Sequence, residues 1–358
     1  MKQVFKTPVG KIILQEISIP TVKPGFVLVK TLYSLISSGT ETRAIAESDG
    51  FFTALLKKGK SFVSKKHTSL HSPLGYCVVG IIVESDTHLS NFKKGDHVVC
   101  AGHGYAVHAE FVCVPQNLVC KIPAGVELRD ATFTAIASIA LHSLRRSHVQ
   151  LGETALVVGL GLTGQLASQL LRLSGCTVLG IDPHDYKISL AQQLGLDFAL
   201  QGKDHFQRSI MDLTQQRGVD AAIICTDISS KKQFEEIASA VRDKGRIVTL
   251  GHVRTTLPSS ILFRREIDLL SSRSFGPGRF DSAYEEQGVD YPFGYVRWTE
   301  KRNMEEILRL LQRKLLRVQP LITHTFPFTD APQAYQILLS KKRPIALLLT
   351  YQSYSKSL

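Results

Sequence analysis

The sequence predicts an α/β protein with two domains, a β-rich lobe followed by a doubly wound parallel sheet. Its 358 residues are about twice the length of a typical domain. Up to about residue 125, short β-rich runs alternate with turn residues, whereas strand-like and helix-like runs alternate from 130 to 275. The composition, 44% hydrophobic and 21% charged, is that of a globular protein and excludes collagen-like, low-complexity and wholly disordered classes.

The first lobe is predicted from six β-rich runs: GKIILQEI, PGFVLVKTLYSLI, GYCVVGIIVES, KKGDHVVCAG, AEFVCV and NLVCKIP. Turn residues separate them at short intervals, which is typical of an all-β lobe. We expect a partly open barrel.

The second lobe is predicted from helices and strands that alternate along the chain. We expect helices at 131–147, 165–175, 186–195 and 234–245, and strands at 153–161, 177–182, 219–226 and 246–251. This alternation is the βαβ pattern of a doubly wound parallel sheet. Residues 276–298 show neither the helical nor the strand periodicity and are predicted to form a long loop. After this loop we expect a helix at 299–316 and a last strand at 345–351.

The charge of the chain limits the kinds of partner that we expect. Lysine and arginine number 43 against 31 acidic residues, a net charge of +12 that favours an anionic partner. The basic residues stand in scattered pairs without interleaved aromatics, so nucleic acid is not expected.

No apolar run reaches the roughly 18 residues of a membrane span, and the N-terminal residues alternate like a strand, so we expect a soluble, cytoplasmic protein.

The six cysteines form no C-x-x-C pair and no short Cys-His cluster. Most lie in strand-like apolar runs, where a free cysteine behaves as a small buried hydrophobe. We therefore expect reduced core thiols and no closed structural zinc site.

The sharpest chemical signal is the run Gly159-Leu160-Gly161-Leu162-Thr163-Gly164 between an apolar strand and an apolar-periodic helix. Glycines in this position let the chain turn tightly and let a pyrophosphate approach backbone N–H groups at a helix N-terminus. The cofactor-binding candidates are Gly159, Gly161, Leu162, Thr163 and Gly164, with Thr226 and Gly251 at the ends of two later strands. The alternative is a glycine turn without a ligand.

Asp182 ends the second strand of this lobe, eighteen residues after Gly164. A carboxylate there accepts hydrogen bonds from the ribose hydroxyls and repels the 2′-phosphate of NADP. The sequence thus favours NAD, although the neighbouring His184 and Lys187 soften that preference and leave NADP possible.

The whole chain resembles the medium-chain dehydrogenase/reductase superfamily. The resemblance rests on Lys94-Gly95-Asp96-His97-Val98, the glycine run with Asp182, Gly245 to Gly251, and Pro320-Leu321-Ile322-Thr323-His324. It implies a GroES-like catalytic domain at 1–136, completed by 300–358, and a Rossmann-like NAD-binding domain at 137–299 that carries the loop 276–298. It also implies hydride transfer between nicotinamide and an alcohol or carbonyl, in a homodimer or homotetramer.

Two segments give a closer resemblance, to the dehydrogenase half of bi-domain oxidoreductases from polysaccharide gene clusters. They are Ser37-Ser38-Gly39-Thr40-Glu41 and the run from Asp290 to Glu300, DYPFGYVRWTE. This resemblance suggests a sugar-like or anionic small-molecule substrate. Because those relatives carry a second oxidoreductase domain, a cofactor-binding partner subunit is an alternative to an independent enzyme.

The sequence departs from the zinc enzymes of the superfamily at their metal ligands. Ser38 stands where they carry the cysteine of Cys-Gly-Thr-Asp, and Tyr76 where they carry the histidine of Gly-His-Glu-x-x-Gly. The third ligand position falls at Ala135 and Ile136. Catalytic zinc needs about three protein ligands, so we expect none to be bound.

Without a metal, the alkoxide must be stabilised and protonated by side chains. By resemblance, Thr40 aligns with the proton-relaying hydroxyl of the zinc enzymes, and Tyr76 stands at the lost histidine, from which a phenol could donate to a carbonyl oxygen. Glu41 could orient Thr40 or act as an acid. The alternatives are simple space-filling for Tyr76 and an ion pair with an arginine for Glu41.

The loop 276–298 supplies the substrate-binding candidates, because the superfamily places this segment beside the cleft between lobes. They are Arg279, Tyr291, Arg297 and Trp298, together with Tyr284 and Asp290. Arginines and aromatic rings suit a carboxylate, a phosphate or a sugar. An oligomer contact is the alternative for this loop, and an NADPH-dependent quinone or enone reductase is the alternative for the enzyme.

Overall fold

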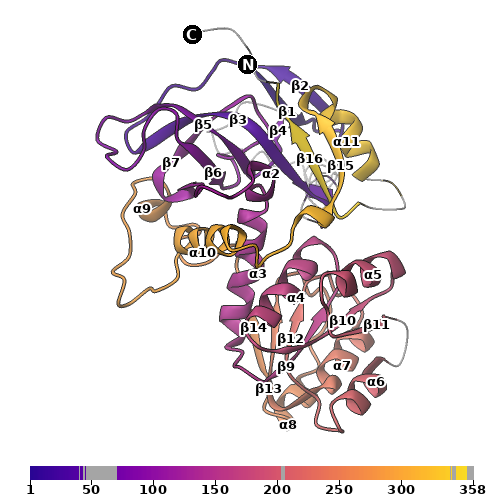
Figure 1. Cartoon of the computed structure of the whole chain (residues 1–358). Helices are drawn as coiled ribbons and strands as arrows, with labels where there is room; N and C mark the ends of the chain where they lie inside the picture. Colours follow the sequence, from indigo (N-terminus) through magenta and orange to yellow (C-terminus); the bar gives the residue numbers. More distant parts are fainter. Residues whose placement is uncertain are drawn as a thin grey trace, which may run out of the picture. The chain divides into compact units, whose positions relative to one another are not determined.

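The computed structural model describes residues 1–39, 41, 42, 45, 71–202, 206–338, 340 and 344–352. The chain divides into two compact units, whose elements are labelled in Figure 1. Unit 1 comprises Met1–Ala135, Phe280–Tyr295 and Leu321–Leu358, and unit 2 comprises Ile136–Arg279 and Val296–Pro320. None of the helices in these described ranges is long and apolar enough to cross a bilayer.

Unit 1 is built mainly from strands, as the β-rich runs predicted. Its strands are β1 (Lys2–Lys6), β2 (Ile12–Glu16), β3 (Phe26–Ser37), β4 (Ser72–Pro73), β5 (Cys77–Ser85), β6 (His97–Ala101), β7 (Phe111–Pro115), β8 (Val119–Lys121), β15 (Ile322–Pro327) and β16 (Ala346–Thr350). Its short helices are η1 (Gln116–Leu118), α2 (Leu128–Ala131), α9 (Ser282–Glu285), η3 (Phe328–Asp330) and α11 (Ala331–Leu338). One sheet runs β15-β16-β3-β5-β6-β8 with β7 also on β3, and a second runs β2-β1-β4.

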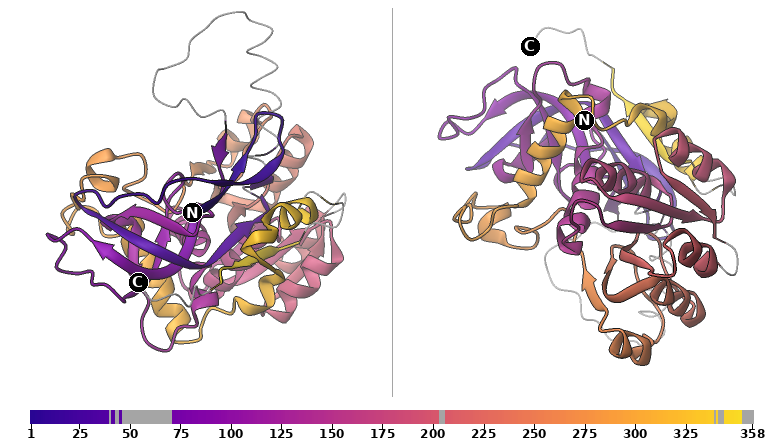
Figure 2. Two further views of the ribbon diagram at one scale, coloured as in Figure 1. Left: turned by 90° about the horizontal axis from the view of Figure 1, so that it is seen from above. Right: turned by 60° about the horizontal axis from the view of Figure 1, so that its bottom comes forward.

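The twelve-residue strand β3 organises unit 1. It pairs antiparallel with β5, with β7 through residues 26–30, and with β16 through residues 33–37. In both views of Figure 2 this strand runs through the sheet in indigo. Segments near the two ends of the chain are therefore joined side by side in one sheet.

Unit 2 contains the predicted doubly wound sheet. Its strands are β9 (Thr154–Val158), β10 (Thr177–Asp182), β11 (Phe198–Gln201), β12 (Val219–Ile224), β13 (Val241–Thr249) and β14 (Asp268–Ser271). Its helices are α3 (Thr134–Ser147, which begins at the end of unit 1), α4 (Leu162–Leu173), α5 (Asp185–Gln193), α6 (Phe206–Leu213), α7 (Lys231–Ala240), α8 (Ser259–Arg264) and α10 (Glu300–Gln312), with η2 (Gln319–Leu321) at its end.

All pairings in the sheet of unit 2 are parallel, in the order β11-β10-β9-β12-β13-β14. Leu156 and Val158 of β9 pack in a core with Phe206 of α6 and Phe234 of α7. The intervening Val157 points to the opposite face, toward α4. Helices cover both faces, as Figure 2 shows, and the predicted fold class is confirmed.

Some elements differ from the prediction. The helix expected at 234–245 ends at Ala240, because Val241 already pairs with Val219 in the sheet. Strand β11 and helix α6 were not predicted, since four- and eight-residue elements carry little periodicity. The cysteines are free thiols, with Cys77, Cys100, Cys120 and Cys176 buried and Cys113 and Cys225 partly buried.

The segment 276–298, predicted as one loop of the Rossmann domain, is divided between the units. Its middle lies with unit 1, where Asn117 donates to the carbonyl of Tyr284 at 2.8 Å and Tyr105 donates to Glu286 at 3.1 Å. Helix α10, predicted to belong to the catalytic domain, lies in unit 2, where Asn303 donates to the carbonyl of Phe275. The observed units therefore differ from the predicted boundaries at 280–295 and 300–320.

His142 of α3 makes a pH dependence of stability expected. Burial, followed by the positive charges of Arg146, Arg145 and Arg273, lowers the pKa of His142 from 6.5 to about 4. The folded state disfavours the imidazolium, so the free energy of unfolding is highest above pH 6.5, where His142 is neutral in both states. It falls as the pH drops from 6.5 toward 4, because the unfolded state then binds a proton that the folded state does not. We expect His142→Gln to flatten the decline of unfolding free energy between these pH values, measured by denaturant titration. An equally steep decline in the variant would contradict this.

Candidate active site

The glycine turn of unit 2 runs from the end of β9 to the start of α4. Gly159 has a φ of +90°, a left-handed conformation that favours glycine, and a Cβ there would lie 2.8 Å from the Cβ of Thr226. A Cβ on Gly164 would lie 1.9 Å from the carbonyl oxygen of Gly159, so the helix packs directly on the turn. At Gly161, the residue before α4, a Cβ would meet nothing within 4 Å.

The space above Gly161 is suited to an anion. No side chain caps α4 at its N-terminus, where the first backbone N–H groups and the helix dipole favour negative charge. The buried Leu162 and the partly exposed Thr163 begin this helix. The turn can therefore bind a phosphate or pyrophosphate through backbone groups.

Three strand ends meet at this turn. β9 and β12 are neighbours at the point where the strand order reverses, which is where ligands bind in open α/β sheets. Thr226 follows β12 and contacts the Gly159 position, while a Cβ on Gly251, after β13, would lie 2.1 Å from the carbonyl oxygen of Thr226. The structure thus brings Gly159, Thr226 and Gly251 together.

Asp182 is buried at the end of β10 and is tied to the glycine turn. Its Oδ2 accepts a hydrogen bond from the backbone N–H of Leu160 at 2.9 Å and lies 3.4 Å from Nζ of Lys187. Its Oδ1 accepts from the backbone N–H of His184 at 3.0 Å and lies 2.9 Å from the Nδ1 of the same residue. A carboxylate and two basic side chains therefore lie together one strand away from the turn.

In unit 1, Glu41 is buried within a polar cluster. It accepts hydrogen bonds from the backbone N–H of Ser37 at 3.2 Å, from the hydroxyl of Tyr335, and from Nε2 of His108 at 3.3 Å. These partners are an imidazole and a phenol in place of the arginine considered as the alternative for Glu41. Thr40, the third predicted catalytic residue, lies outside the described residues.

His108 is the cluster residue that the sequence did not reveal. It is fully buried, and its Nδ1 lies 2.8 Å from Oγ of Ser34. A Cβ on Gly75 would lie 2.8 Å from the imidazole, so the glycine before Tyr76 makes room for this ring. A single histidine in the apolar run AVHAEFVCV carries no ligand spacing that could have marked it.

Tyr76 is buried beside the same cluster. The pKa of Tyr335 is raised well above its usual value, mainly by burial and then by the carboxylate of Glu41, and the phenols of Tyr351 and Tyr76 act in the same direction. The structure therefore groups two of the three predicted catalytic residues, Glu41 and Tyr76, around Tyr335.

The predicted substrate residues are distributed over both units. In unit 2, two guanidinium groups stack on the ring of Trp298: Cζ of Arg145 lies 3.3 Å and Cζ of Arg297 lies 3.7 Å from the ring centroid. Burial lowers the pKa of Arg145 to about 10. Arg279 also belongs to unit 2 and is partly buried.

Tyr291 belongs to unit 1 with the middle of the segment. Its ring stacks on Tyr284 at 5.3 Å, and its hydroxyl donates to Asp281 at 2.5 Å. Asp290 beside it is exposed and accepts a hydrogen bond from the backbone N–H of Tyr291. Of the four predicted substrate residues, Arg279, Arg297 and Trp298 thus belong to unit 2 and Tyr291 belongs to unit 1.

The positions that align with zinc ligands carry other chemistry. The hydroxyl of Ser38 donates to the carbonyl of Ile345 at 3.1 Å, and Ala135 and Ile136 are apolar and buried. Beside Tyr76, burial raises the pKa of the Cys77 thiol to about 12, which disfavours the thiolate that binds metals. Within the described ranges, no group of three or more His, Cys, Asp or Glu side chains could hold a metal ion. The described residues at these aligned positions therefore offer a hydroxyl, a phenol and apolar side chains in place of a thiolate or an imidazole.

Comparison with known proteins yields dehydrogenases. Residues 163–287 match the family model described as zinc-binding dehydrogenase. The chain is 30% identical over 268 residues to the D-guloside 3-dehydrogenase of Escherichia coli, covering 73% of this chain and 72% of that protein. It is 23% identical to a sorbitol dehydrogenase of Halalkalibacterium halodurans, in a match that covers 82% of this chain and 76% of that protein. The structure of an Escherichia coli galactitol-1-phosphate dehydrogenase matches the fold with a TM-score of 0.77 at 18% sequence identity. The match covers 98% of this chain and 100% of that one.

Proposed function

The chain belongs to the medium-chain dehydrogenase/reductase superfamily, and on that premise we propose that it is a zinc-independent, NAD-preferring dehydrogenase of a polyol or sugar derivative. It is an oxidoreductase of the alcohol-dehydrogenase type. Its relatives named for D-guloside and sorbitol support the substrate class.

The observation that carries the proposal is the glycine turn with Asp182. The open position at Gly161 and the uncapped start of α4 fit a pyrophosphate, with Thr163, Thr226 and Gly251 around it. The carboxylate of Asp182 fits ribose hydroxyls. A bound nicotinamide supplies or takes up the hydride.

The chain's own side chains would replace the metal. In this proposal Tyr76 donates a hydrogen bond to the reacting oxygen, and Thr40 and Glu41 handle its proton. The zinc-ligand positions carry Ser38, Tyr76 and the apolar pair Ala135 and Ile136, which supports a metal-free reaction. Arg279, Tyr291, Arg297 and Trp298 are proposed to bind the substrate, for which arginines suit an anionic group.

The experiment that tests the proposal uses the metal-free protein. NADH and NADPH are titrated separately, following energy transfer from Trp298, the single tryptophan, to the reduced nicotinamide. Oxidation of methyl D-guloside, D-sorbitol and galactitol 1-phosphate is then measured with NAD⁺. Binding of NADH and turnover of one probe without added metal is the expected result. Turnover that requires zinc would overturn the metal-free part, and binding of neither cofactor would overturn the whole.

Asp182→Asn is expected to shift cofactor preference toward NADPH. The amide removes the charge that repels a 2′-phosphate but keeps an oxygen for the backbone N–H of Leu160, and His184 and Lys187 remain as partners for the phosphate. The ratio of dissociation constants for NADH and NADPH should change by at least about tenfold, measured by the same titration.

A matched control for this variant is Asp197→Asn. Asp197 also accepts from a backbone N–H, that of Val178 at 2.9 Å, and also pairs with a basic side chain, Arg172 at 3.4 Å. It should leave the preference unchanged. If the Asp182 variant behaves like this control, Asp182 does not select the cofactor.

The basic pair beside Asp182 favours a second candidate function, an NADPH-dependent quinone or enone reductase. His184 and Lys187 both lie within hydrogen-bonding range of the carboxylate and could bind a 2′-phosphate. Preference of the parent protein for NADPH would favour this candidate. NADH binding without turnover would favour a subunit that acts with a second oxidoreductase.

A further inference from the structure

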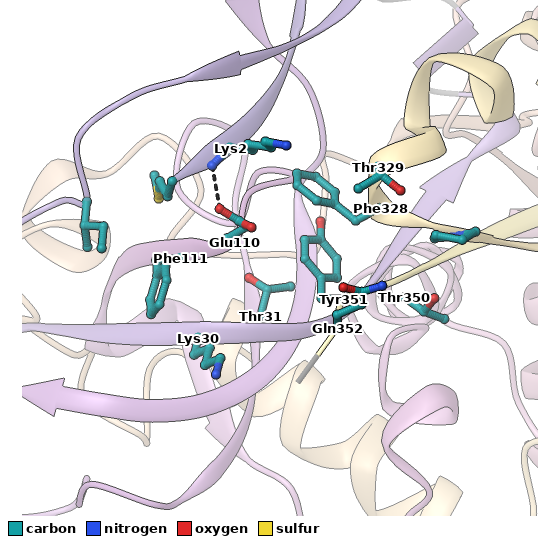
Figure 3. Close-up of a pocket in the computed structure, with 13 residues that line it drawn as sticks. Lys2, Lys30, Thr31, Glu110, Phe111, Phe328, Thr329, Thr350, Tyr351 and Gln352 are labelled. Carbon is teal, nitrogen blue, oxygen red and sulfur yellow. Dashed lines mark hydrogen bonds between the residues drawn. The ribbon is translucent and has the colours of Figure 1, made fainter. Parts of the chain in front are cut away.

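Unit 1 contains a cavity of about 380 Å³ beside Lys30 and Thr31 of β3. Residues from six segments line it, among them Lys2, Thr31, Glu110, Phe328 and Tyr351. Figure 3 shows Tyr351 beside the ring of Phe328 and near Glu110, and the two rings stack at 4.3 Å.

This cavity suits water. One water occupies about 30 Å³ and needs polar partners, and the cavity wall supplies a carboxylate, ammonium groups and hydroxyls. The buried hydroxyl of Thr31 has no hydrogen-bond partner among the residues that the structure describes. A water molecule in the cavity would satisfy it.

A line of hydrogen bonds leads from the cavity wall to Glu41. The hydroxyl of Tyr351 lies 3.0 Å from Oγ of Ser34, and Oγ of Ser34 lies 2.8 Å from Nδ1 of His108. Nε2 of His108 lies 3.3 Å from Oε2 of Glu41. Three contacts therefore connect a group at the cavity to the carboxylate that follows Thr40 in the sequence.

The chemistry of the four groups fixes one direction for these bonds. A carboxylate only accepts, so Nε2 of His108 carries the hydrogen, and the neutral imidazole then accepts at Nδ1. Ser34 donates to Nδ1 and accepts from Tyr351. Burial raises the pKa of Tyr351 above its usual range, so its hydroxyl remains a donor. Tyr351, Ser34 and His108 each have one donor and one acceptor in line, as proton transfer along the chain requires.

We propose that Tyr351, Ser34 and His108 relay protons between the cavity and Glu41, which exchanges them with the reacting oxygen. The relay rests on the proposed function. In carbonyl reduction Glu41 begins in its neutral, protonated form. The hydride adds to carbon with two electrons, the π pair moves to oxygen, and oxygen takes the carboxyl proton of Glu41, which leaves the carboxylate that accepts from His108. His108 replaces that proton from Nε2 while Nδ1 takes the proton of Ser34. Ser34 takes that of Tyr351, which takes one from a water molecule in the cavity and leaves hydroxide there. Alcohol oxidation runs the same transfers backward.

Several groups set the electrostatics around His108. Glu41 lies against Nε2, and the ring of Tyr335 from α11 lies 6.3 Å away. Tyr76 follows Gly75, whose backbone packs on the imidazole, and Glu110 is two residues further along the chain. Apart from the carboxylates Glu41 and Glu110, these neighbours are neutral phenols.

The first test needs no substrate. In full-length protein labelled with ¹⁵N-histidine, imidazole correlation spectra should show His108 with the hydrogen on Nε2 and a hydrogen-bonded, unprotonated Nδ1. Ser34→Ala should shift the Nδ1 resonance, and His108→Gln assigns the signals. A hydrogen on Nδ1 would overturn the relay.

The second test uses Tyr351→Phe, which removes only the hydroxyl at the outer end. With the fastest of the three sugar probes, kcat should fall at least about tenfold with a larger solvent deuterium isotope effect, because proton delivery becomes limiting. KM and NADH affinity should stay unchanged. Tyr105→Phe is the matched control, since it removes a phenol hydroxyl that donates to Glu286 elsewhere in unit 1.

These outcomes separate the relay from the proposed function. An unchanged kcat and isotope effect in Tyr351→Phe would overturn the relay and leave the dehydrogenase intact. Failure of the parent protein to bind NADH would overturn both. NADH binding without turnover of any probe would count against the sugar substrate. In that case the imidazole spectra test the relay alone: a hydrogen on Nε2 of His108 supports it and a hydrogen on Nδ1 overturns it.

Discussion

Replacing Gly161 by alanine is expected to weaken NADH binding about 100-fold while leaving folding intact. A Cβ there meets no protein atom within 4 Å, and its φ is not in the left-handed region, so the protein alone should tolerate alanine. The same Cβ would occupy the space through which a pyrophosphate reaches the start of α4. Each lost hydrogen bond to a charged group costs about 1.5–3 kcal/mol, so one or two account for the effect. The Trp298 titration measures it.

The matched control is Gly294→Ala in unit 1, a second glycine with open surroundings and no left-handed φ. Both variants should unfold at the denaturant concentration of the parent protein, and only Gly161→Ala should lose NADH affinity. Parent-like affinity in Gly161→Ala would show that no pyrophosphate approaches this residue.

Replacing Glu41 by alanine is expected to lower the free energy of unfolding by about 3 kcal/mol. The carboxylate accepts from the N–H of Ser37, from the imidazole of His108 and from the hydroxyl of Tyr335, all in a buried site. Its removal leaves these donors without an acceptor and without water. Urea unfolding of the full chain measures the loss.

Two variants test the origin of this loss. Glu41→Gln keeps an acceptor oxygen and should cost clearly less than the alanine. Glu110→Ala removes a partly exposed carboxylate that accepts from the backbone of Lys2, and should cost less than about 1 kcal/mol. Equal losses for the buried and the partly exposed glutamate would contradict the assignment of Glu41 to a buried network.

The sequence could predict those parts of the fold and site that are local along the chain. The turn at 159–164 and Asp182 lie within one strand-helix-strand repeat, and glycines at fixed offsets are required wherever that repeat binds a phosphate. The alternation of β-rich and βαβ segments likewise indicated both units. The end of α7 was missed because pairing of Val241 in the sheet overrides a helical pattern that continues past it.

The Glu41 cluster could not be predicted because its contacts join distant parts of the chain. His108 is 67 residues and Tyr335 is 294 residues from Glu41, and neither stands in a motif with fixed spacing. The sequence indicated that Glu41 could matter, but its partners are set by how β3, β16 and α11 pack. The division of segment 276–298 between the units could not be predicted for the same reason, because it depends on contacts between distant residues such as Asn117 and Tyr284.

The pairing of β3 with β16 has a consequence for biosynthesis. β3 ends at Ser37, but β16 (Ala346–Thr350), the strand that pairs with residues 33–37 of β3, leaves the ribosome only after all of unit 2 has been synthesised. The parallel sheet of unit 2, from β9 to β14, is synthesised before that strand. The later lobe can therefore fold first, while the earlier one waits with an open strand edge that invites aggregation. Expression should depend on chaperones that shield this edge until β16 has been synthesised.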